Sequence, residues 1–253
     1  MEPVLVVKDI VKHFGGLTAV DHVTLEVYPN EVVGLVGDNG AGKSTLIKMI
    51  AGVHQPNGGE IYFEGHRVKI NTPSAARDMG IETIYQDLAL AGNLDLSANI
   101  FLGREAKKRY LGGLIHVLDE KYMLDASKRS LSVLDIHIAS FTEEIDKLSG
   151  GQRQAVAIAR AHHWHAKLMI MDEPTNNLGV TEQRKVLEVI RTLRRQKVPV
   201  ILISHTLPEV FSITDRIVVM HRGRKVADKR TAETTSQEIV EYMMGVLDDT
   251  RGP

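Results

Sequence analysis

The fold of this chain is decided by the stretch Gly37-Asp38-Asn39-Gly40-Ala41-Gly42-Lys43-Ser44-Thr45. An apolar, strand-like run at residues 32–36 precedes it, and a helix-like run at residues 46–52 follows it. The pattern Gly-x-x-x-x-Gly-Lys-Ser/Thr between a strand and a helix is that of the phosphate-binding loop, or Walker A motif. Its glycines let backbone N–H groups turn inward around a phosphate chain, and the positive end of the following helix favours the same anion. We therefore expect a nucleotide site here rather than a flexible glycine turn.

The residues of this loop have distinct expected roles. Lys43 is expected to reach the β- and γ-phosphates of the nucleotide, and the Ser44 hydroxyl is expected to ligate Mg²⁺. The other residues of the expected nucleotide cradle are Gly37, Asp38, Asn39, Gly40, Ala41, Gly42 and Thr45. Such a loop by itself only binds nucleotide, so hydrolysis requires further residues elsewhere in the chain.

Length and composition exclude several classes of protein. The chain has 253 residues, 43% of them hydrophobic and 25% charged, which suits one large domain or a domain with a subdomain. Its net charge of −1 provides no basic field, so we expect no nucleic-acid partner. Cysteine is absent, which excludes disulfides and thiolate chemistry. The start has no signal-peptide pattern, and no apolar run approaches the ~18 residues of a membrane span, so a membrane role requires another chain.

Strand and helix patterns alternate through the first third of the sequence. Residues 5–9 and 23–28 are predicted to be strands, with a turn at residues 12–16 that carries the lone aromatic Phe14. The further predicted elements are a hairpin of residues 60–63 and 67–70, a helix from Thr72-Pro73 to Gly80, and a strand at residues 81–85.

The middle of the chain, residues 87–147, has few β-branched runs and is predicted to be a mostly helical subdomain. Helical periodicity is clearest at residues 119–134, whose predicted inner face includes Tyr122 and Met123. The charged stretch at residues 104–109 is predicted to be a solvated surface rather than a binding patch.

The last third returns to alternating strands and helices, which favours a mainly parallel sheet with helices on both faces and an antiparallel portion beside it. The predicted elements are helices at 149–165, 181–196 and 207–214, strands at 167–171 and 198–204, a hairpin of 216–220 and 225–228, and a last helix opened by a capping box at Thr235–Glu238.

An apolar strand pattern ends in two adjacent carboxylates, Asp172 and Glu173. Taken alone, such a pair is more often surface charge. Together with a phosphate-binding loop, it is the Walker B arrangement, in which an acid at a strand end fixes Mg²⁺ and a neighbouring base acts on water. We expect Asp172 to hold the metal and Glu173 to polarise the attacking water.

A second glycine-rich helix start, Leu148-Ser149-Gly150-Gly151-Gln152, resembles the signature motif of the ABC ATPase family. A well-capped helix would explain the same residues. However, two separate phosphate-cradling loops in one chain suggest that the second loop also binds phosphate. The resemblance covers nearly the whole chain and implies a P-loop NTPase (RecA-like) α/β core with an antiparallel β subdomain and an inserted α-helical subdomain. It also implies that Ser149, Gly150, Gly151 and Gln152 bind the ATP of a second copy, giving a head-to-tail homodimer.

Three further residues match family positions in order. Gln86, after a predicted strand, matches the Q-loop glutamine, which implies contact with Mg²⁺ and water and a link to the membrane subunit. His205 matches the switch histidine, which implies contact with the γ-phosphate and orientation of Glu173 or the water. Phe14 matches the aromatic residue that stacks on adenine. The resemblance thus implies catalytic roles for Glu173, His205 and Gln86. It also implies that Ser44, Gln86 and Asp172 bind Mg²⁺.

One position departs from the family pattern. The family usually reads Ser-Ala-Leu-Asp after the Walker B acids, whereas this chain has Asn176-Asn177-Leu178-Gly179. In the family this loop crosses the dimer interface, so Gly179 affects the coupling of the two sites rather than nucleotide binding.

The stretches around residues 37–44, 82–90 and 99–105 are closest to the ATPases of monosaccharide importers of the ribose, galactose and fructose type. This likeness implies a subunit that uses ATP to power sugar import through transmembrane permease subunits, fed indirectly by a periplasmic or extracellular sugar-binding protein. It places the chain at the cytoplasmic face of the membrane. Many relatives hold two cassettes in one chain, but this chain holds one set of motifs, so it should act as a homodimer or pair with a separate partner.

The implied domain is a single ABC ATPase spanning residues 1–253. Residues 1–86 and 160–230 form the core with the β subdomain, residues 87–159 the helical subdomain, and residues 231–253 a C-terminal helix and tail. Two alternatives remain open. A non-transport ABC ATPase would carry long heptads between its motifs, which this chain lacks. A regulatory module would bind ATP without turnover, and only the altered loop Asn177-Leu178-Gly179 favours it.

Histidines cluster at His162, His163 and His165. A metal site is a weak interpretation, because neighbouring residues of a helix point to different sides and too few ligands remain on one face.

Overall fold

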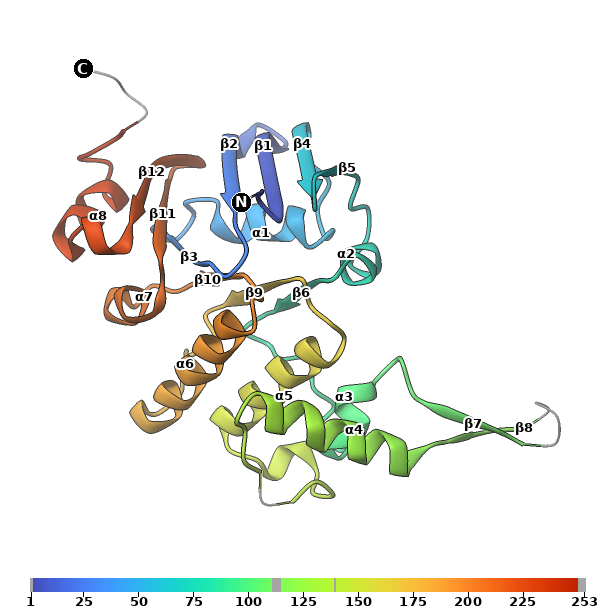
Figure 1. Ribbon diagram of the computed structural model, residues 1–253. Coiled ribbons are helices and arrows are strands. Elements are labelled where there is room, and N and C mark those ends of the chain that lie inside the picture. Colours follow the sequence, from blue (N-terminus) through green and yellow to red (C-terminus); the bar gives the residue numbers. More distant parts are fainter. Residues whose placement is uncertain (1, 111–114, 139, 250–253) are drawn as a thin grey trace. The chain divides into compact units, whose positions relative to one another are not determined.

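The computed structural model describes residues 2–110, 115–138 and 140–249 (Figure 1). The chain divides into two compact units by its internal contacts. The first comprises residues 1–83, 166–174 and 193–253, and the second comprises residues 84–165 and 175–192.

The first unit contains a six-stranded sheet in the order β12-β11-β3-β10-β9-β6. Its strands are β3 (Val32–Val36), β6 (Ile81–Ile84), β9 (Leu168–Asp172), β10 (Val200–Ile203), β11 (Arg216–His221) and β12 (Arg224–Arg230). Strand β3 pairs in parallel with β10 and β11, β10 pairs in parallel with β9, and β12 closes the edge antiparallel to β11. Val200 stands opposite Val32 and Met169, so the carboxyl ends of β3, β9 and β10 meet at one edge of the sheet. In open α/β sheets this edge is where ligands bind.

A second, antiparallel sheet in this unit has the order β2-β1-β4-β5. Its strands are β1 (Leu5–Phe14), β2 (Leu17–Val27), β4 (Gly58–Phe63) and β5 (His66–Val68). The prediction of a turn at residues 12–16 was wrong in extent, because Phe14 still belongs to β1 and only the glycines after it turn the chain. Register shifts along the β1–β2 pair interrupt the alternation of apolar residues, and Asp9 has a left-handed φ of 52° within them. Because each bulge shifts the two-residue alternation, the sequence pattern does not show the full length of the strand.

Four helices of the first unit are α1 (Lys43–Ile50), α2 (Pro73–Met79), α7 (Leu207–Ile213) and α8 (Ser236–Met243). The predicted start of α2 is confirmed, because Thr72 caps it by accepting from the Ala75 N–H at 3.2 Å. The predicted capping box of α8 is half formed: Thr235 accepts from the Glu238 N–H at 3.2 Å, but the Glu238 carboxylate accepts from the Thr234 hydroxyl instead. The predicted α/β fold class is confirmed, since buried aliphatic residues of β1, β3 and α1 form one core beneath the parallel sheet.

A partly buried ion cluster joins the two ends of this unit's sequence. Arg216 of β11 donates to Glu31 at 2.8 Å, to Asp228 at 2.7 and 2.9 Å, and to the Glu26 carbonyl at 2.6 Å. The Arg216 and Glu31 side chains are only 15% and 14% exposed. We expect Arg216→Ala to lower the free energy of unfolding by about 3 kcal/mol, because it leaves the mostly buried Glu31 carboxylate without its cation.

Urea denaturation of this variant beside Arg224→Ala would test that expectation. Arg224 pairs with Asp21 at 2.6 Å, but its side chain is 62% exposed, so its removal should cost less than about 1 kcal/mol. Equal costs for the two variants would contradict the role given to the partly buried cluster.

The second unit is mainly helical. Its elements are α3 (Leu96–Phe101), β7 (Lys107–Tyr110), β8 (Ile115–Leu118), α4 (Glu120–Val133), α5 (Gly150–His163) and most of α6 (Val180–Arg195). The predicted helix at 119–134 is confirmed as α4, with Asp119 as its cap, but Tyr122 is 50% exposed and does not belong to the inner face. Beside α4 and α5, the rings of Phe101 and Trp164 meet edge to face at 5.6 Å.

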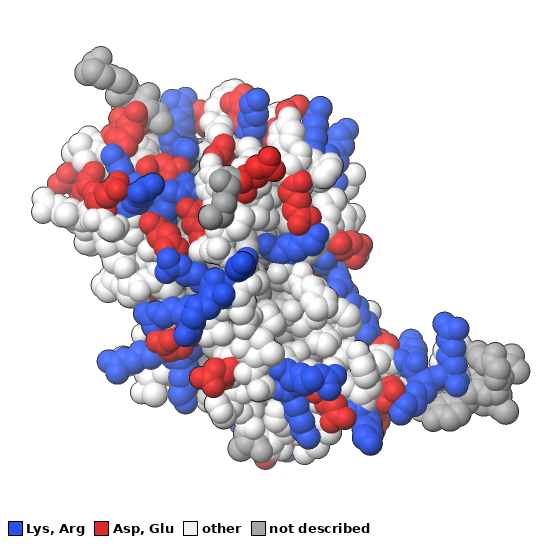
Figure 2. Space-filling view, in the orientation of Figure 1, with Lys and Arg blue, Asp and Glu red and all other residues white. Residues whose placement is uncertain are grey.

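The antiparallel hairpin β7–β8 was not predicted. Its first strand consists of charged residues that lack strand propensity, so the pattern indicated only a solvated surface. That exposure is confirmed for Lys107, Lys108 and Arg109, and basic side chains line this segment (Figure 2). Residues 104–106 are half-buried instead, and the Arg104 guanidinium lies 4.9 Å from the centre of the Trp164 ring. Elsewhere on the visible face, acidic and basic side chains are interspersed (Figure 2). In the described part of the chain, no helix combines the length and apolar character that a membrane span needs.

Candidate functional site

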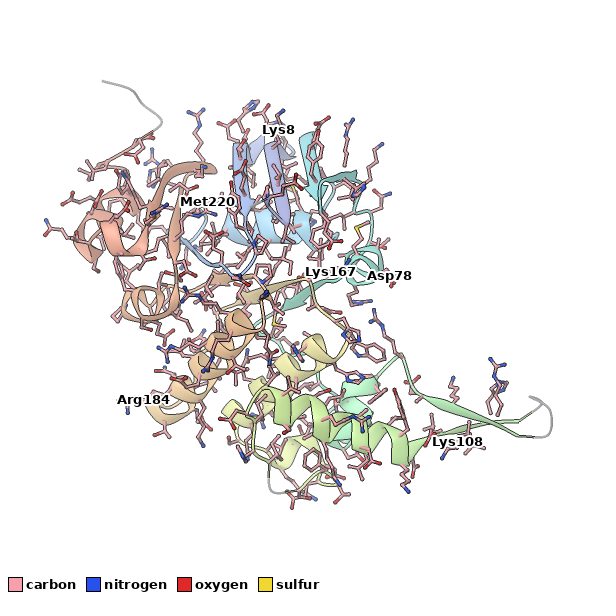
Figure 3. The ribbon with its side chains drawn as sticks, viewed as in Figure 1. Lys8, Asp78, Lys108, Lys167, Arg184 and Met220 are labelled. Carbon is pink, nitrogen blue, oxygen red and sulfur yellow. The ribbon has the colours of Figure 1, made fainter. Side chains whose placement is uncertain are left out.

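The phosphate-binding loop leaves β3 and enters α1 through three glycines with positive φ, Gly37 at 147°, Gly40 at 81° and Gly42 at 101°. A Cβ at Gly37 would lie 2.2 Å from the carbonyl oxygen of Met220, which Figure 3 shows in β11, and a Cβ at Gly42 would lie 2.5 Å from the carbonyl oxygen of Ala19. Only glycine fits at these two positions. No side chain caps the N-terminus of α1, so its first N–H groups are left for another acceptor.

Lys43 lies folded back over this loop. Its ammonium donates to the carbonyl oxygens of Gly37 at 2.6 Å and Asp38 at 3.0 Å. Burial lowers the pKa of Lys43, while the nearby carboxylates of Glu173, Asp172 and Asp38 act in the opposite direction. The predicted phosphate-binding lysine therefore stands beside the predicted acidic pair.

The acidic pair sits where β9 ends. Asp172 is the last residue of β9, and burial raises the pKa of its carboxyl, as does the neighbouring Glu173, against the lowering effect of Lys43 and Lys48. Glu173 has a left-handed φ of 51°, and its N–H donates to the Ile203 carbonyl at 2.9 Å. This conformation is uncommon outside glycine and asparagine, and such strain clusters at functional sites.

His205 completes this edge of the sheet. It follows β10, and its Nδ1 lies 3.1 Å from Glu173 Oε1. The His205 side chain is 64% exposed and that of Glu173 is 27% exposed, so both can meet a ligand from solvent. A carboxylate oriented by an imidazole beside a lysine-bearing anion loop is an arrangement suited to activating water next to a phosphate.

Phe14 ends β1 and is 44% exposed. Its ring meets the His54 ring edge to face at 5.2 Å, and the Lys12 ammonium lies 5.1 Å from the ring centre. A large ring held in place yet open to solvent is unusual for a core residue and suits stacking on a base.

We expect Phe14→Ala to weaken ATP binding about 10-fold, because stacking of a base on an aromatic ring is lost. Isothermal titration with ATP and with inorganic triphosphate would test this, since triphosphate has no base and its affinity should not change. Leu17→Ala is the matched control, because Leu17 lies across the same turn and is 67% exposed. Equal losses for ATP and triphosphate would contradict stacking.

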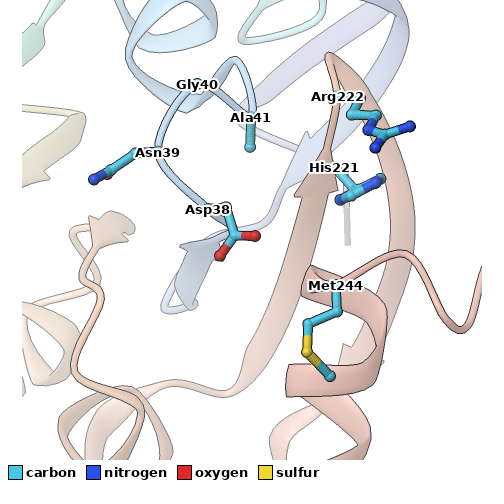
Figure 4. Close-up of a pocket in the computed structure, with 7 residues that line it drawn as sticks. All are labelled: Asp38, Asn39, Gly40, Ala41, His221, Arg222 and Met244. Atoms are coloured by element: carbon cyan, nitrogen blue, oxygen red, sulfur yellow. The ribbon is translucent and has the colours of Figure 1, made fainter.

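A pocket of about 370 Å³ flanks the loop on the side of β11 (Figure 4). Its lining residues are Asp38, Asn39, Gly40, Ala41, His221, Arg222 and Met244. Lys43, Asp172 and Glu173 are not among them, so this hollow borders the outer face of the loop rather than the reacting groups.

In the second unit, Ser149 caps α5 with a full capping box. The Ser149 Oγ accepts from the Gln152 N–H at 3.3 Å, and the Ser149 N–H donates to Gln152 Oε1 at 2.9 Å. Ser149 is exposed and Gly150 is partly exposed, so the start of α5 is open to a neighbouring molecule. A buried Ser149 would have removed the predicted shared site.

Two other predicted residues also lie in the second unit. Gln86 is exposed and follows the end of β6 by two residues. Gly179 is exposed, with nothing within 4 Å of the place where a Cβ would stand, so the aspartate usual in the family would fit there without a clash. Sequence reasoning missed Glu182, whose carboxylate accepts from the Ser149 hydroxyl. The only local signal was an acid three residues after Gly179, in the first turn of α6.

Of the histidines at the end of α5, His163 packs inside the second unit. His163 Nδ1 lies 2.8 Å from the Ser130 hydroxyl, and its ring packs 4.7 Å from that of Phe101 and 4.9 Å from that of Trp164. Burial lowers the pKa of His163, and the charges of His165 and His162 add to that effect. Among the described residues, no group of three or more His, Asp or Glu is placed to hold a metal ion by itself.

Comparison with known proteins relates this chain to ATP-binding proteins of ABC transporters. The profile of the ABC transporter family matches residues 20–176. The xylose/arabinose import ATP-binding protein XylG of Sulfolobus acidocaldarius is 46% identical over 96% of this chain and 94% of its own length. The fructose import ATP-binding protein FrcA of Rhizobium meliloti is 42% identical over 99% of this chain and 97% of its own length. The ribose import ATP-binding protein RbsA of Clostridium tetani is 38% identical over 96% of this chain but only 47% of its own length.

Solved structures of ATP-binding cassettes have the same fold as this chain. A nucleotide-free ATP-binding cassette of an ABC transporter superposes with a TM-score of 0.81 at 26% identity, covering 96% of this chain and 95% of its own. The ADP conformation of the cassette MJ1267 gives the same TM-score and identity and covers 96% of both chains. Fold and site together define a P-loop ATP-binding cassette. The chain belongs to the ABC transporter family, and the predicted family and fold are confirmed.

Proposed function

We propose that this chain is the ATP-hydrolysing subunit of an ABC importer and that it powers the uptake of a monosaccharide through separate transmembrane permease subunits. The observation that carries the proposal is the contact of Glu173 with His205 at 3.1 Å, at the sheet edge where Lys43 stands beside the Walker B acids. Such a set of groups is suited to hydrolysis rather than to binding alone.

The phosphate-binding loop holds the triphosphate in this proposal. Lys43 exchanges its two loop carbonyls for the β- and γ-phosphates, and the uncapped N–H groups at the start of α1 bind the same anion. The Ser44 hydroxyl and the Asp172 carboxylate supply oxygen donors only. Mg²⁺ prefers such donors and keeps several of its waters, so this small set fits it. When bound, Mg²⁺ neutralises charge on the β- and γ-phosphates.

Glu173 acts as the base. Its carboxylate accepts a proton from the attacking water, and His205 orients that carboxylate through the observed contact. Because the N–H of Glu173 is bound to the Ile203 carbonyl, the base is held to the end of β10 while its side chain faces solvent.

Each ATP is completed by a second copy of the chain. The exposed Ser149 hydroxyl and the N–H groups at the start of α5 bind the γ-phosphate held by the partner's loop, so two copies assemble head to tail around two nucleotides. We keep the predicted single domain of residues 1–253, with the helical subdomain at 87–159. Open Gly179 leaves the loop after Walker B without its usual acid, which weakens coupling between the two sites.

The choice of a sugar as cargo is supported by the relatives named above, whose names specify the import of xylose or arabinose, fructose and ribose. The identity holds along nearly the entire chain rather than over the ATP motifs alone. The proposal places the chain at the cytoplasmic face of the membrane, with an external sugar-binding protein delivering the cargo to the permease.

Phosphate release from the purified chain, with and without its permease in lipid nanodiscs, tests this function. We expect turnover that rises when the permease and a sugar-loaded binding protein are present, with Lys43→Ala as the inactive control. ATP binding without phosphate release in either setting would support a regulatory module instead. Turnover that the permease never alters would support a non-transport ATPase.

A further inference from the structure

The first turn of α6 places an acid against the signature loop. Interaction of the Glu182 carboxylate with the Ser149 hydroxyl and with the Gly151 and Gly179 N–H groups lowers its pKa. The contact is close along the whole side chain: a Cβ at Gly151 would lie 2.8 Å from the Cβ of Glu182, and one at Gly150 would lie 4.0 Å from its Oε2. All of these residues belong to the second compact unit.

The donors that Glu182 uses are those that the proposed function gives to ATP. The hydroxyl of the exposed Ser149 and the N–H of the buried Gly151 form an anion site at the start of α5, and here an internal anion already lies against both. These hydrogen bonds, that of the Ser149 hydroxyl first, hold the pKa of Glu182 below its usual range, so the side chain is charged at neutral pH. A γ-phosphate approaching the same donors meets a carboxylate of like charge.

We propose that Glu182 is an internal occupant of the signature loop, and that the γ-phosphate of the partner's ATP must displace its carboxylate before the dimer can close. The inference rests on the proposed function, since it takes the shared ATP site as given. Glu182 is a positioning residue rather than a catalytic one. Because the same carboxylate also binds the Gly179 N–H, its displacement releases the loop after Walker B from the signature loop. In this proposal, ATP binding is coupled to the loop after Walker B by Glu182, because Gly179 replaces the aspartate that is usual in the family.

The test uses Glu182→Gln in a Glu173→Gln parent, which stops turnover and lets the ATP-bound dimer accumulate. Glutamine keeps an oxygen for Gly179 but loses the charge, and charge-assisted hydrogen bonds are about twice as strong as neutral ones. We expect the ATP concentration for half-maximal dimer, measured by analytical ultracentrifugation, to fall roughly 3- to 10-fold. Binding of ATP to the monomer at low protein concentration should not change, and a merely structural role would not produce that difference.

Glu188→Gln is the matched control. Glu188 lies on the same helix and pairs with Arg191, and its side chain is 62% exposed, so the dimer midpoint should stay at the parent's value. Thermal melting of Glu182→Ala shows whether the contact also supports the fold, and Glu182→Ala should shift the midpoint in the same direction as glutamine if it folds. A midpoint that rises or stays constant in Glu182→Gln would overturn the proposal and leave Glu182 as a support of the loop. A parent that never dimerises with ATP would overturn the shared site and this inference together.

Discussion

Replacing Glu173 by glutamine is expected to lower phosphate release at saturating ATP by about 100- to 1,000-fold while nucleotide affinity stays within about two-fold. Glutamine has nearly the same shape, so the backbone contact with Ile203 and the left-handed turn can persist. It cannot take a proton from water, however, and the charge that faces Lys43 is gone. Turnover and binding should therefore separate, which is the behaviour of a base and not of a structural residue.

Single-turnover phosphate release and equilibrium ATP binding measure the two effects. Glu233→Gln provides a control, since Glu233 is an exposed acid that pairs with Arg230 far from the loop in sequence. If Glu173→Gln releases phosphate at the parental rate, the base must be sought elsewhere. If it loses ATP binding as well, the acid supports the site's structure rather than the chemistry.

Lys43→Ala is expected to weaken ATP binding by about 100-fold, because the loop loses the one ammonium that its backbone positions for the phosphates. In the structure this ammonium is held by two loop carbonyls, at 2.6 and 3.0 Å, so its side chain is already ordered before nucleotide arrives. The loss should grow with the number of phosphates and be smallest for AMP, since the lysine is expected to reach only the β- and γ-phosphates.

Isothermal titration with ATP, ADP and AMP measures this gradient, with Lys69→Ala as the control at an exposed lysine. Equal losses for all three nucleotides would contradict the assignment of Lys43 to the terminal phosphates and would indicate a general disturbance of the loop.

The parts of the site that were predictable are those whose signal is local. A strand, a glycine-rich turn and a helix lie next to one another in sequence, so residues 37–45 predict their own shape. The same holds for Asp172 at the end of an apolar strand and for Ser149 at a helix start. In a parallel sheet, strand ends meet at one edge, which is why elements far apart in the chain could be expected to converge.

The parts that could not be predicted depend on contacts between distant segments or on broken periods. Bulges interrupt the apolar alternation of β1, so its second half, residues 10–14, was not predicted. Tyr122 falls on the inner face of α4 by helical periodicity, but it is half exposed in the structure. A charged strand such as β7 has no propensity signal of its own. Glu182 was missed because its partners are loops of separate segments, and nothing in its own neighbourhood distinguishes it from any acid in a first helical turn.

The crowding at Gly37 and Gly42 has a genetic consequence. The obstacles there are the peptide oxygens of Met220 and Ala19, which every amino acid carries. A different side chain at residue 19 or 220 would leave these backbone oxygens in place and would not remove the clash. Second-site suppressors of a Gly37 or Gly42 mutation should therefore not arise at residues 19 or 220. Backbone atoms at residues 19 and 220 therefore restrict positions 37 and 42 to glycine, whichever side chains those two residues carry.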